Sequence, residues 1–195
     1  MSSSLDAERT FWRNLNRYRG ILMRYHFYFG LFGTHLSSRR FQCVADIGCG
    51  PCPFILWMKA TRLIAIDPLV EDFQAMPQWA RFWPSQVERH QSLENIPDGT
   101  IDGAFLLNLF DHIEPSARPP FMGRLAKAMK SGGWLYVFTH LHNKRDRFHY
   151  PVGKEELAEL LNSHGFVAHS SGFSQERLNP SWPPLSQWAI LKVAH

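Results

Sequence analysis

The sequence predicts an α/β fold: a seven-stranded, mainly parallel sheet with helices on both faces and an antiparallel hairpin at the C-terminal end. Three observations predict it. From residue 41 onward, short apolar runs alternate with helical stretches, which is typical of the units that build a parallel sheet. Several runs are apolar throughout, as strands buried on both faces must be. The last two runs have no helical pattern between them, which predicts the hairpin.

The expected elements follow from apolar periodicity and from residues that end helices. The predicted strands are 41–47, 62–67, 86–91, 101–110, 134–140, 166–173 and 187–194. The predicted helices are 54–60, 69–76, 117–130 and one that begins near Glu155. We expect Ser116 to cap the third of these helices, with Gly132 and Gly133 beyond its end, and Gly165 to end the fourth.

Residues 5–35 predict two helices, because apolar side chains recur there at three- and four-residue steps and Gly33 is a plausible stop. The helices either pack as an amphipathic pair against the core or act as a lid that supplies an aromatic wall over a ligand. We therefore expect one domain over residues 1–195, with 5–35 as a helical lid or cap and 41–195 as the ligand-binding core.

Composition excludes several classes of protein. The 195 residues are 45% hydrophobic and 14% aromatic, which argues against disorder. A spanning helix is not expected, because no run of about 18 apolar residues occurs. We see no secretory signal, and the three cysteines indicate no disulfide framework, so we expect a cytoplasmic protein. A formal net charge of +4 is weak evidence for nucleic acid.

The segment DIGCGPC, residues 46–52, is the most informative one. Gly48 and Gly50 lie between a predicted strand and a predicted helix, where glycines let a ligand approach the main chain. Asp67 ends the next strand, and a carboxylate there suits the hydroxyls of a ribose. A dinucleotide loop would have a third glycine, which is missing, and Asp46 would repel a pyrophosphate. The loop therefore favours a ligand that carries an ammonium and a sulfonium.

VADIGCGPCPF, residues 44–54, resembles the glycine-rich loop of the class I S-adenosylmethionine-dependent methyltransferases. IAIDPL (64–69), IDGAFLLNLFDHI (101–113) and LAKAMKSGGWLYV (125–137) resemble later segments of that family in the same order. The resemblance implies the Rossmann-like fold of the family, S-adenosyl-L-methionine as cofactor, and methyl transfer as activity. The cofactor residues that it implies, or that lie beside its donor site, are Asp46, Gly48, Gly50, Asp67, Pro68, Ser92, Leu93 and Asn108. Ser92 stands where the family often has an acid, and Cys52 replaces the third glycine.

Candidates for work on the acceptor follow the fourth and fifth predicted strands. His112 and His149 are the expected catalytic groups, either orienting the acceptor or removing a proton from it. The expected substrate-binding residues are Tyr18, Tyr25, Tyr28, Asp111 and His140. The short N-terminal helix pair favours a small acceptor, and its aromatic side chains favour an aromatic or lipophilic one, methylated on oxygen or nitrogen. No metal is expected, because no carboxylate completes a familiar spacing with the histidines near residues 140–149.

Several alternatives stay open. The arginines of residues 9–24 could dock an RNA or a protein, and the chain could bind S-adenosylmethionine without catalysis. Residues 49–52, from Cys49 to Cys52, have the sequence CGPC of thioredoxin-like redox sites, although no aromatic residue precedes them. A hydride-transferring oxidoreductase is the remaining alternative. The acceptor and the oligomeric state are not indicated.

Overall fold

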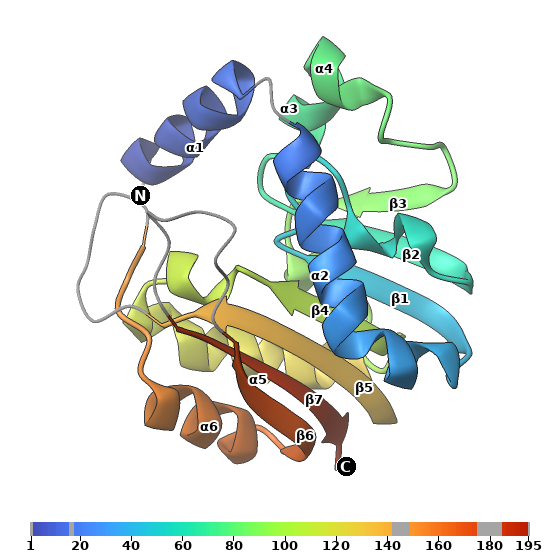
Figure 1. Cartoon of the computed structure of the whole chain (residues 1–195), viewed down its shortest axis with the longest axis vertical. Coiled ribbons are helices and arrows are strands. Elements are labelled where there is room, and N and C mark those ends of the chain that lie inside the picture. The colour runs from blue at the N-terminus through green and yellow to red at the C-terminus, as the bar shows by residue number, and fades with distance from the viewer. Residues whose placement is uncertain (1, 16–17, 142–148, 175–184, 195) are drawn as a thin grey trace. The chain divides into compact units, whose positions relative to one another are not determined.

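The computed structural model describes residues 2–15, 18–141, 149–174 and 185–194 (Figure 1). For residues 2–4 and 18–23 it describes the helical backbone alone, so the side chain of Tyr18 lies outside the described part. The chain divides into two compact units, Met1–Ser92 and Leu93–His195, and each is described by itself below. The expected single domain stays a prediction. Among the described helices, none is both long and apolar enough to cross a membrane.

The first unit holds three parallel strands and most of the helices. The strands are β1 (Phe41–Ile47), β2 (Ala60–Ile66) and β3 (Val87–His90), in the order β3-β2-β1. Val44 pairs with Leu63, and Ile64 pairs with Glu88. The helices are α1 (Ser2–Asn14), α2 (Tyr18–Ser37), α3 (Val70–Ala75) and α4 (Pro77–Ala80), with a 3₁₀ turn, η1, at Phe54–Trp57.

The N-terminal helix α1 packs as part of the core of this unit. The ring of Trp12 meets Phe73 and Trp79 edge to face, with 6.1 Å between ring centroids in both pairs. Trp79 Nε1 also donates to the carbonyl of Trp12 at 3.1 Å. Arg9 Nε reaches Asp72 Oδ1 at 3.0 Å. These contacts favour the interpretation of α1 as a packed helix.

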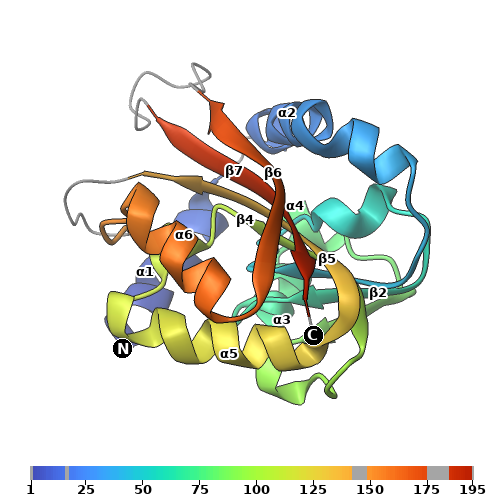
Figure 2. The ribbon, with the colours of Figure 1, turned by 90° about the horizontal axis from the view of Figure 1, so that it is seen from below.

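The second unit carries four strands in the order β4-β5-β7-β6. They are β4 (Ile101–Leu107), β5 (Met129–His140), β6 (Phe166–Ser174) and β7 (Ser186–Val193). β4 and β5 are parallel, whereas β7 is antiparallel to both of its neighbours. The helices α5 (Arg118–Ala128) and α6 (Lys154–Ser163) lie on the same face of these strands (Figure 2). Short 3₁₀ turns occur at η2 (Leu93–Asn95), η3 (Phe110–His112) and η4 (Pro115–Ala117).

The predicted fold class is confirmed. The seven predicted strands are present, and β7 is antiparallel to both β5 and β6, which makes the C-terminal hairpin. The fully apolar runs predicted as buried strands have buried centres in β1, β4 and β5. A strand buried on both faces has no room for polar side chains, so its apolar composition is its clearest signal.

The helix predicted over residues 54–60 is wrong. Only Phe54–Trp57 turn, as a 3₁₀ helix, because β2 already begins at Ala60 to pair with Phe41. The helix predicted to stop at Gly33 continues to Ser37, where the hydroxyls of Ser37 and Ser38 bond to carbonyls of the last turn. Both errors concern the residue at which a helix ends, which depends on hydrogen bonding and strand pairing more than on amino-acid composition.

The helix predicted over 117–130 differs at both ends. Ser116 is not its cap: η4 spans Pro115–Ala117, Ala117 takes the N-cap position, and no side chain caps the helix. The helix ends at Ala128, and β5 starts at Met129. Gly132 and Gly133 therefore lie within a strand irregularity and not beyond a helix: the register jumps from Ile101–Met129 to Gly103–Trp134. Gly132 has φ of 74°, and a Cβ on Gly133 would come within 2.9 Å of a carbonyl.

Candidate functional site

In the first unit, the loop after β1 is shaped by two glycines in the left-handed region. Gly48 has φ of 70° and Gly50 has φ of 59°, conformations that side chains disfavour. The amide of Gly48 donates to Ile66 O at 2.8 Å, which holds the loop against the end of β2. The amide of Gly50 donates to Asp67 Oδ2 at 3.0 Å. The loop and the acid that follows β2 are thus joined directly.

The Asp67 carboxylate has a fixed orientation. Its Oδ1 accepts from the amide of Leu69 at 2.9 Å, while its Oδ2 accepts from Gly50. A carboxylate oxygen can accept two hydrogen bonds, so such an acid can also receive the two hydroxyls of a ribose. Asp67 is 9% exposed, and the neighbouring Pro68 is exposed. This arrangement is compatible with a ribose held at Asp67 and an adenine lying against Pro68.

Asp46 is buried beneath the same loop. Its Oδ2 accepts from the amide of Phe54, the first residue of the η1 turn, at 2.5 Å. Burial raises the pKa of Asp46 to about 7, against the opposing effect of the backbone hydrogen bonds from Phe54 and Ile55. The charged form of Asp46 therefore needs a nearby cation or an added donor to be favoured at neutral pH.

Aromatic residues of α2 lie beside the loop. The Tyr25 hydroxyl donates to the carbonyl of Cys52, and its ring meets Phe54 at 5.5 Å and Trp57 at 5.0 Å between centroids. The ring of Trp57 is partly open to solvent, at 46% exposure, whereas Tyr28 is only 2% exposed and packs on Phe54. Tyr25 and Trp57 are thus better placed than Tyr28 to meet a ligand.

The two loop cysteines are not prepared for redox chemistry. Cys49 and Cys52 are buried and free. Burial raises the pKa of Cys49 well above its usual value and that of Cys52 to about 12. Because the thiolate is the reactive form, these thiols are poor nucleophiles at neutral pH.

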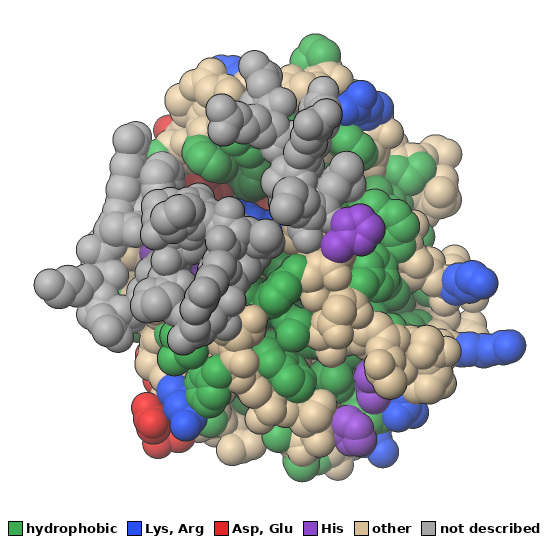
Figure 3. Space-filling model, in the orientation of Figure 1, with side chains coloured by type: hydrophobic (Ala, Val, Ile, Leu, Met, Phe, Trp, Pro, Cys, Tyr) green, Lys and Arg blue, Asp and Glu red, His purple; other side chains and the backbone are tan. Residues whose placement is uncertain are grey.

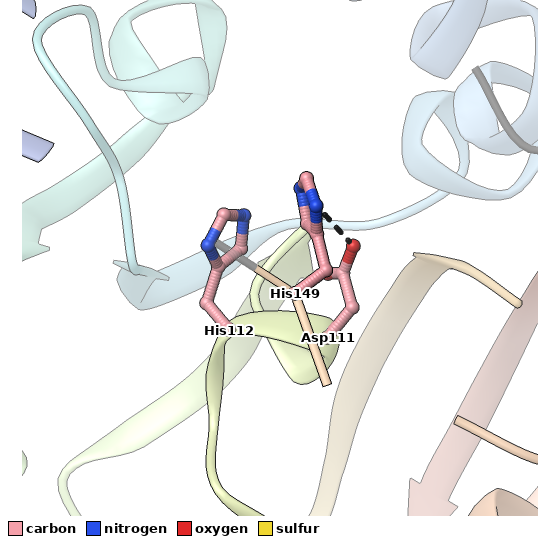
Figure 4. Close-up of side chains that lie close together, drawn as sticks. All are labelled: Asp111, His112 and His149. Carbon is pink, nitrogen blue, oxygen red and sulfur yellow. Dashed lines mark ion pairs between the residues drawn. The ribbon is translucent and has the colours of Figure 1, made fainter. Parts of the chain in front are cut away.

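In the second unit, Asp111, His112 and His149 come together (Figure 4). Asp111 and His112 belong to η3, directly after β4, and His149 precedes α6. His149 Nε2 lies 4.0 Å from Asp111 Oδ2, and the two imidazole rings are 4.8 Å apart between centroids with an interplanar angle of 57°. The Asp111 side chain is 1% exposed and that of His149 is 28% exposed. A buried carboxylate thus stands beside two half-buried imidazoles.

One backbone hydrogen bond and one arginine side chain hold the segments of this cluster together. The amide of Tyr150 donates to the carbonyl of Asp111 at 2.7 Å. The buried Arg118 of α5 donates from Nε to Ile113 O at 3.1 Å and from Nη2 to Pro151 O at 2.8 Å, and its Nη1 pairs with Glu156. One guanidinium therefore fixes both the chain after His112 and the chain after His149. No sequence signal indicated Arg118, because a single arginine in a helix is usually solvated.

The remaining predicted residues lie elsewhere in the second unit, apart from Ser92, which ends the first unit. His140 Nδ1 is 2.7 Å from the hydroxyl of Ser186, across the β5–β7 pair, and is not part of the cluster. Asn108, just after β4, has φ of 56°, and its amide donates to Phe138 O at 2.8 Å. Ser92 is half-buried at the end of the first unit, and Leu93 is buried at the start of the second.

Comparisons with known proteins agree on one fold. A family model described as a methyltransferase domain matches residues 45–137. A search of curated proteins finds no match.

Among solved structures, the N-methyltransferase NodS from Bradyrhizobium japonicum WM9 is 17% identical with a TM-score of 0.71, over 93% of this chain and 100% of that one. The 1,6-didemethyltoxoflavin-N1-methyltransferase of Burkholderia thailandensis, solved with its substrate and S-adenosylhomocysteine, is 20% identical with a TM-score of 0.65, covering 85% and 76%. The geranyl diphosphate C-methyltransferase of Streptomyces coelicolor A3(2), which also holds S-adenosylhomocysteine, is 10% identical with a TM-score of 0.66, covering 85% and 74%.

Proposed function

We propose that this chain is a class I S-adenosylmethionine-dependent methyltransferase and that it transfers the methyl group of S-adenosylmethionine to a small-molecule acceptor. The observation that carries the proposal is the hydrogen bond from Gly50 to Asp67, which joins the glycine loop to an acid suited to a ribose. A loop and a carboxylate that are bonded to each other before the ligand arrives lose little conformational freedom on binding.

On the donor side, Gly48 and Gly50 would leave the main chain open to the methionine part of the donor, and Asp67 would accept from the ribose hydroxyls. Asp46 would favour the ammonium group, whose positive charge offsets the cost of burying a carboxylate. Pro68, Ser92, Leu93 and Asn108 are proposed as further donor contacts.

On the acceptor side, His112 and His149 are proposed to orient the nucleophile and, for a hydroxyl or a protonated amine, to take up its proton. The sulfonium is already a good leaving group. The main task of the protein is therefore to align the acceptor with the carbon–sulfur bond and to exclude water. In the methyl-transfer step, the acceptor atom forms a bond to the methyl carbon while the electron pair of the carbon–sulfur bond returns to sulfur.

An aromatic or lipophilic acceptor is proposed, methylated on oxygen or nitrogen. Tyr25 and Trp57 support it, because they offer aromatic surface next to the glycine loop. Two of the structurally similar enzymes are named for small-molecule substrates, which supports a small acceptor here as well.

An RNA or protein acceptor has less support. Arg9, one of the arginines that could dock a polymer, is engaged with Asp72 and Asp6. Among the described residues that Figure 3 shows in colour, the Lys and Arg side chains stand at separate places on this face. Binding that is dominated by phosphate contacts needs several such cations together.

A methylation screen tests the proposal. The chain is incubated with isotopically labelled S-adenosylmethionine and a fractionated metabolite extract, and we expect label in a small organic product. With that acceptor in hand, His149→Ala should lower turnover by roughly 100-fold, the lower end of what a positioned acid or base contributes, with donor affinity nearly unchanged. Label recovered only in RNA or protein fractions would contradict the small-molecule proposal. Unchanged turnover of His149→Ala would contradict the proposed role of His149.

A further inference from the structure

The cluster of Asp111, His112 and His149 has the composition of a metal site. It offers one carboxylate and two imidazoles, and the possible ligand atoms all lie within 4.8 Å of one another. Nitrogen and oxygen ligands at about 2.0–2.2 Å from one ion would stand roughly 3–4 Å apart, so the cluster needs only a small contraction to close on an ion.

The ring geometry leaves both imidazoles able to turn a nitrogen toward a common point. Their planes are inclined by 57°, so the rings are not stacked face to face. Figure 4 shows the two rings side by side, with the Asp111 carboxylate directed at His149.

Charge also favours a cation at this place. The side chain of Asp111 is 1% exposed, and burying a carboxylate is costly unless a positive charge accompanies it. A divalent ion beside Asp111 would lower the cost of its burial and would also use the two imidazoles.

Hydrogen bonds hold the backbone around the cluster in place, as a preformed metal site requires. The link from Tyr150 to Asp111 and the two carbonyls held by Arg118 fix the backbone on both sides of the cluster. Groups that orient the ligands in this manner contribute much of the affinity of a metal site.

We propose that Asp111, His112 and His149 bind one divalent transition-metal ion, such as Zn²⁺ or Co²⁺. The mixed nitrogen and oxygen donors distinguish this site from the all-oxygen sites that Mg²⁺ and Ca²⁺ prefer. Three protein ligands leave at least one coordination position open. With an ion present, His149 would serve as a ligand, and the open position would take an oxygen or nitrogen of the acceptor.

Metal titration of the whole chain tests the site without donor or acceptor, so its outcome is separate from that of methyl transfer. The protein is stripped with a chelator and titrated with Co²⁺ by calorimetry and visible absorption, and Zn²⁺ is then added to displace it. We expect one Co²⁺ per chain, with visible bands typical of four or five ligands that Zn²⁺ abolishes, and no comparable heat with Mg²⁺.

Variants decide whether the bound ion is at this cluster. Asp111→Asn and His149→Gln should each weaken Co²⁺ binding by at least roughly 10- to 100-fold, the range that loss of even an outer group produces. His169→Gln, an exposed histidine of β6, is the matched control and should bind like the wild type.

Two results would overturn the proposal: a wild-type chain that binds no Co²⁺, or binding that both variants leave unchanged. Circular dichroism checks that the variants are folded. If Asp111→Asn does not fold, His149→Gln decides alone, since that side chain is partly exposed.

Discussion

The glycine loop of the first unit and the histidine cluster of the second unit are built in different ways. The loop is local: Gly48, Gly50 and Asp67 lie at the ends of two adjacent strands, and backbone amides bond to the acid. The cluster joins η3 to the chain before α6 through a backbone link and the buried Arg118. Residues of both sites were predicted from the sequence, but the grouping of Asp111, His112 and His149 into one cluster depends on links between distant segments, which the structure shows.

The largest effect is expected at Arg118, on which the second site depends and the first does not. Arg118→Ala would leave the carbonyls of Ile113 and Pro151 without this donor and would remove the ion pair between the buried guanidinium and the exposed Glu156. We expect a loss of about 2–4 kcal/mol in the free energy of unfolding, measured with urea. Binding of S-adenosylhomocysteine by the folded variant should stay near the wild-type value.

A matched arginine serves as the control for that variant. Arg62 forms an exposed pair with Glu88, so Arg62→Ala should cost less than about 1 kcal/mol. Equal losses in the two variants would contradict the assignment of Arg118 as the residue that holds the cluster together.

An effect of similar size, specific to the first site, is expected from pH. Asp46 has a pKa of about 7 in the folded chain against 3.8 as its ordinary value, because of burial. The folded state therefore holds this proton more tightly than the unfolded state does. Its contribution to stability is fully present below about pH 4 and is lost as the pH rises through about 7.

The isosteric variant Asp46→Asn isolates that contribution. The wild type should lose up to roughly 2–4 kcal/mol more than the variant between pH 4.5 and 7.5, from about 1.4 kcal/mol per unit of pKa shift. Urea unfolding at the two pH values gives, for the wild type and for the variant, the change in the free energy of unfolding. Parallel curves for the two proteins would show that Asp46 titrates normally in the folded chain.

The smallest effect is expected at Asn108, whose φ of 56° lies in the left-handed region. Asn108→Ala should cost about 1 kcal/mol of folding stability, whereas Asn108→Gly should cost less, because glycine adopts this conformation freely. If the side-chain carboxamide of Asn108 also contacts the donor, both variants should weaken S-adenosylhomocysteine binding equally. Equal stability of the Ala and Gly variants would show that no backbone strain exists there.

The sequence predicted what depends on local pattern. Apolar runs located the seven strands, and the Gly48–Gly50 loop with Asp67 was found because its parts directly follow two of them. It did not predict where β5 begins, because the irregularity at Gly132 and Gly133 is set by pairing with β4. Asp111 and His149 were predicted separately as residues that face the acceptor, but their contact was not predicted, because it depends on the hydrogen bond from Tyr150 and on Arg118, which link distant parts of the chain.

Calorimetric titration with S-adenosylhomocysteine tests the central claim most directly, that the loop and Asp67 together hold the donor. The wild-type chain should bind one equivalent, and Asp67→Ala should bind roughly 100-fold more weakly, as expected for the loss of charge-assisted hydrogen bonds worth about 3 kcal/mol. Asp98→Ala, an exposed acid that pairs with Arg124, is the control and should bind normally. Equal affinity of Asp67→Ala and the wild type, or no binding by either, would contradict the account.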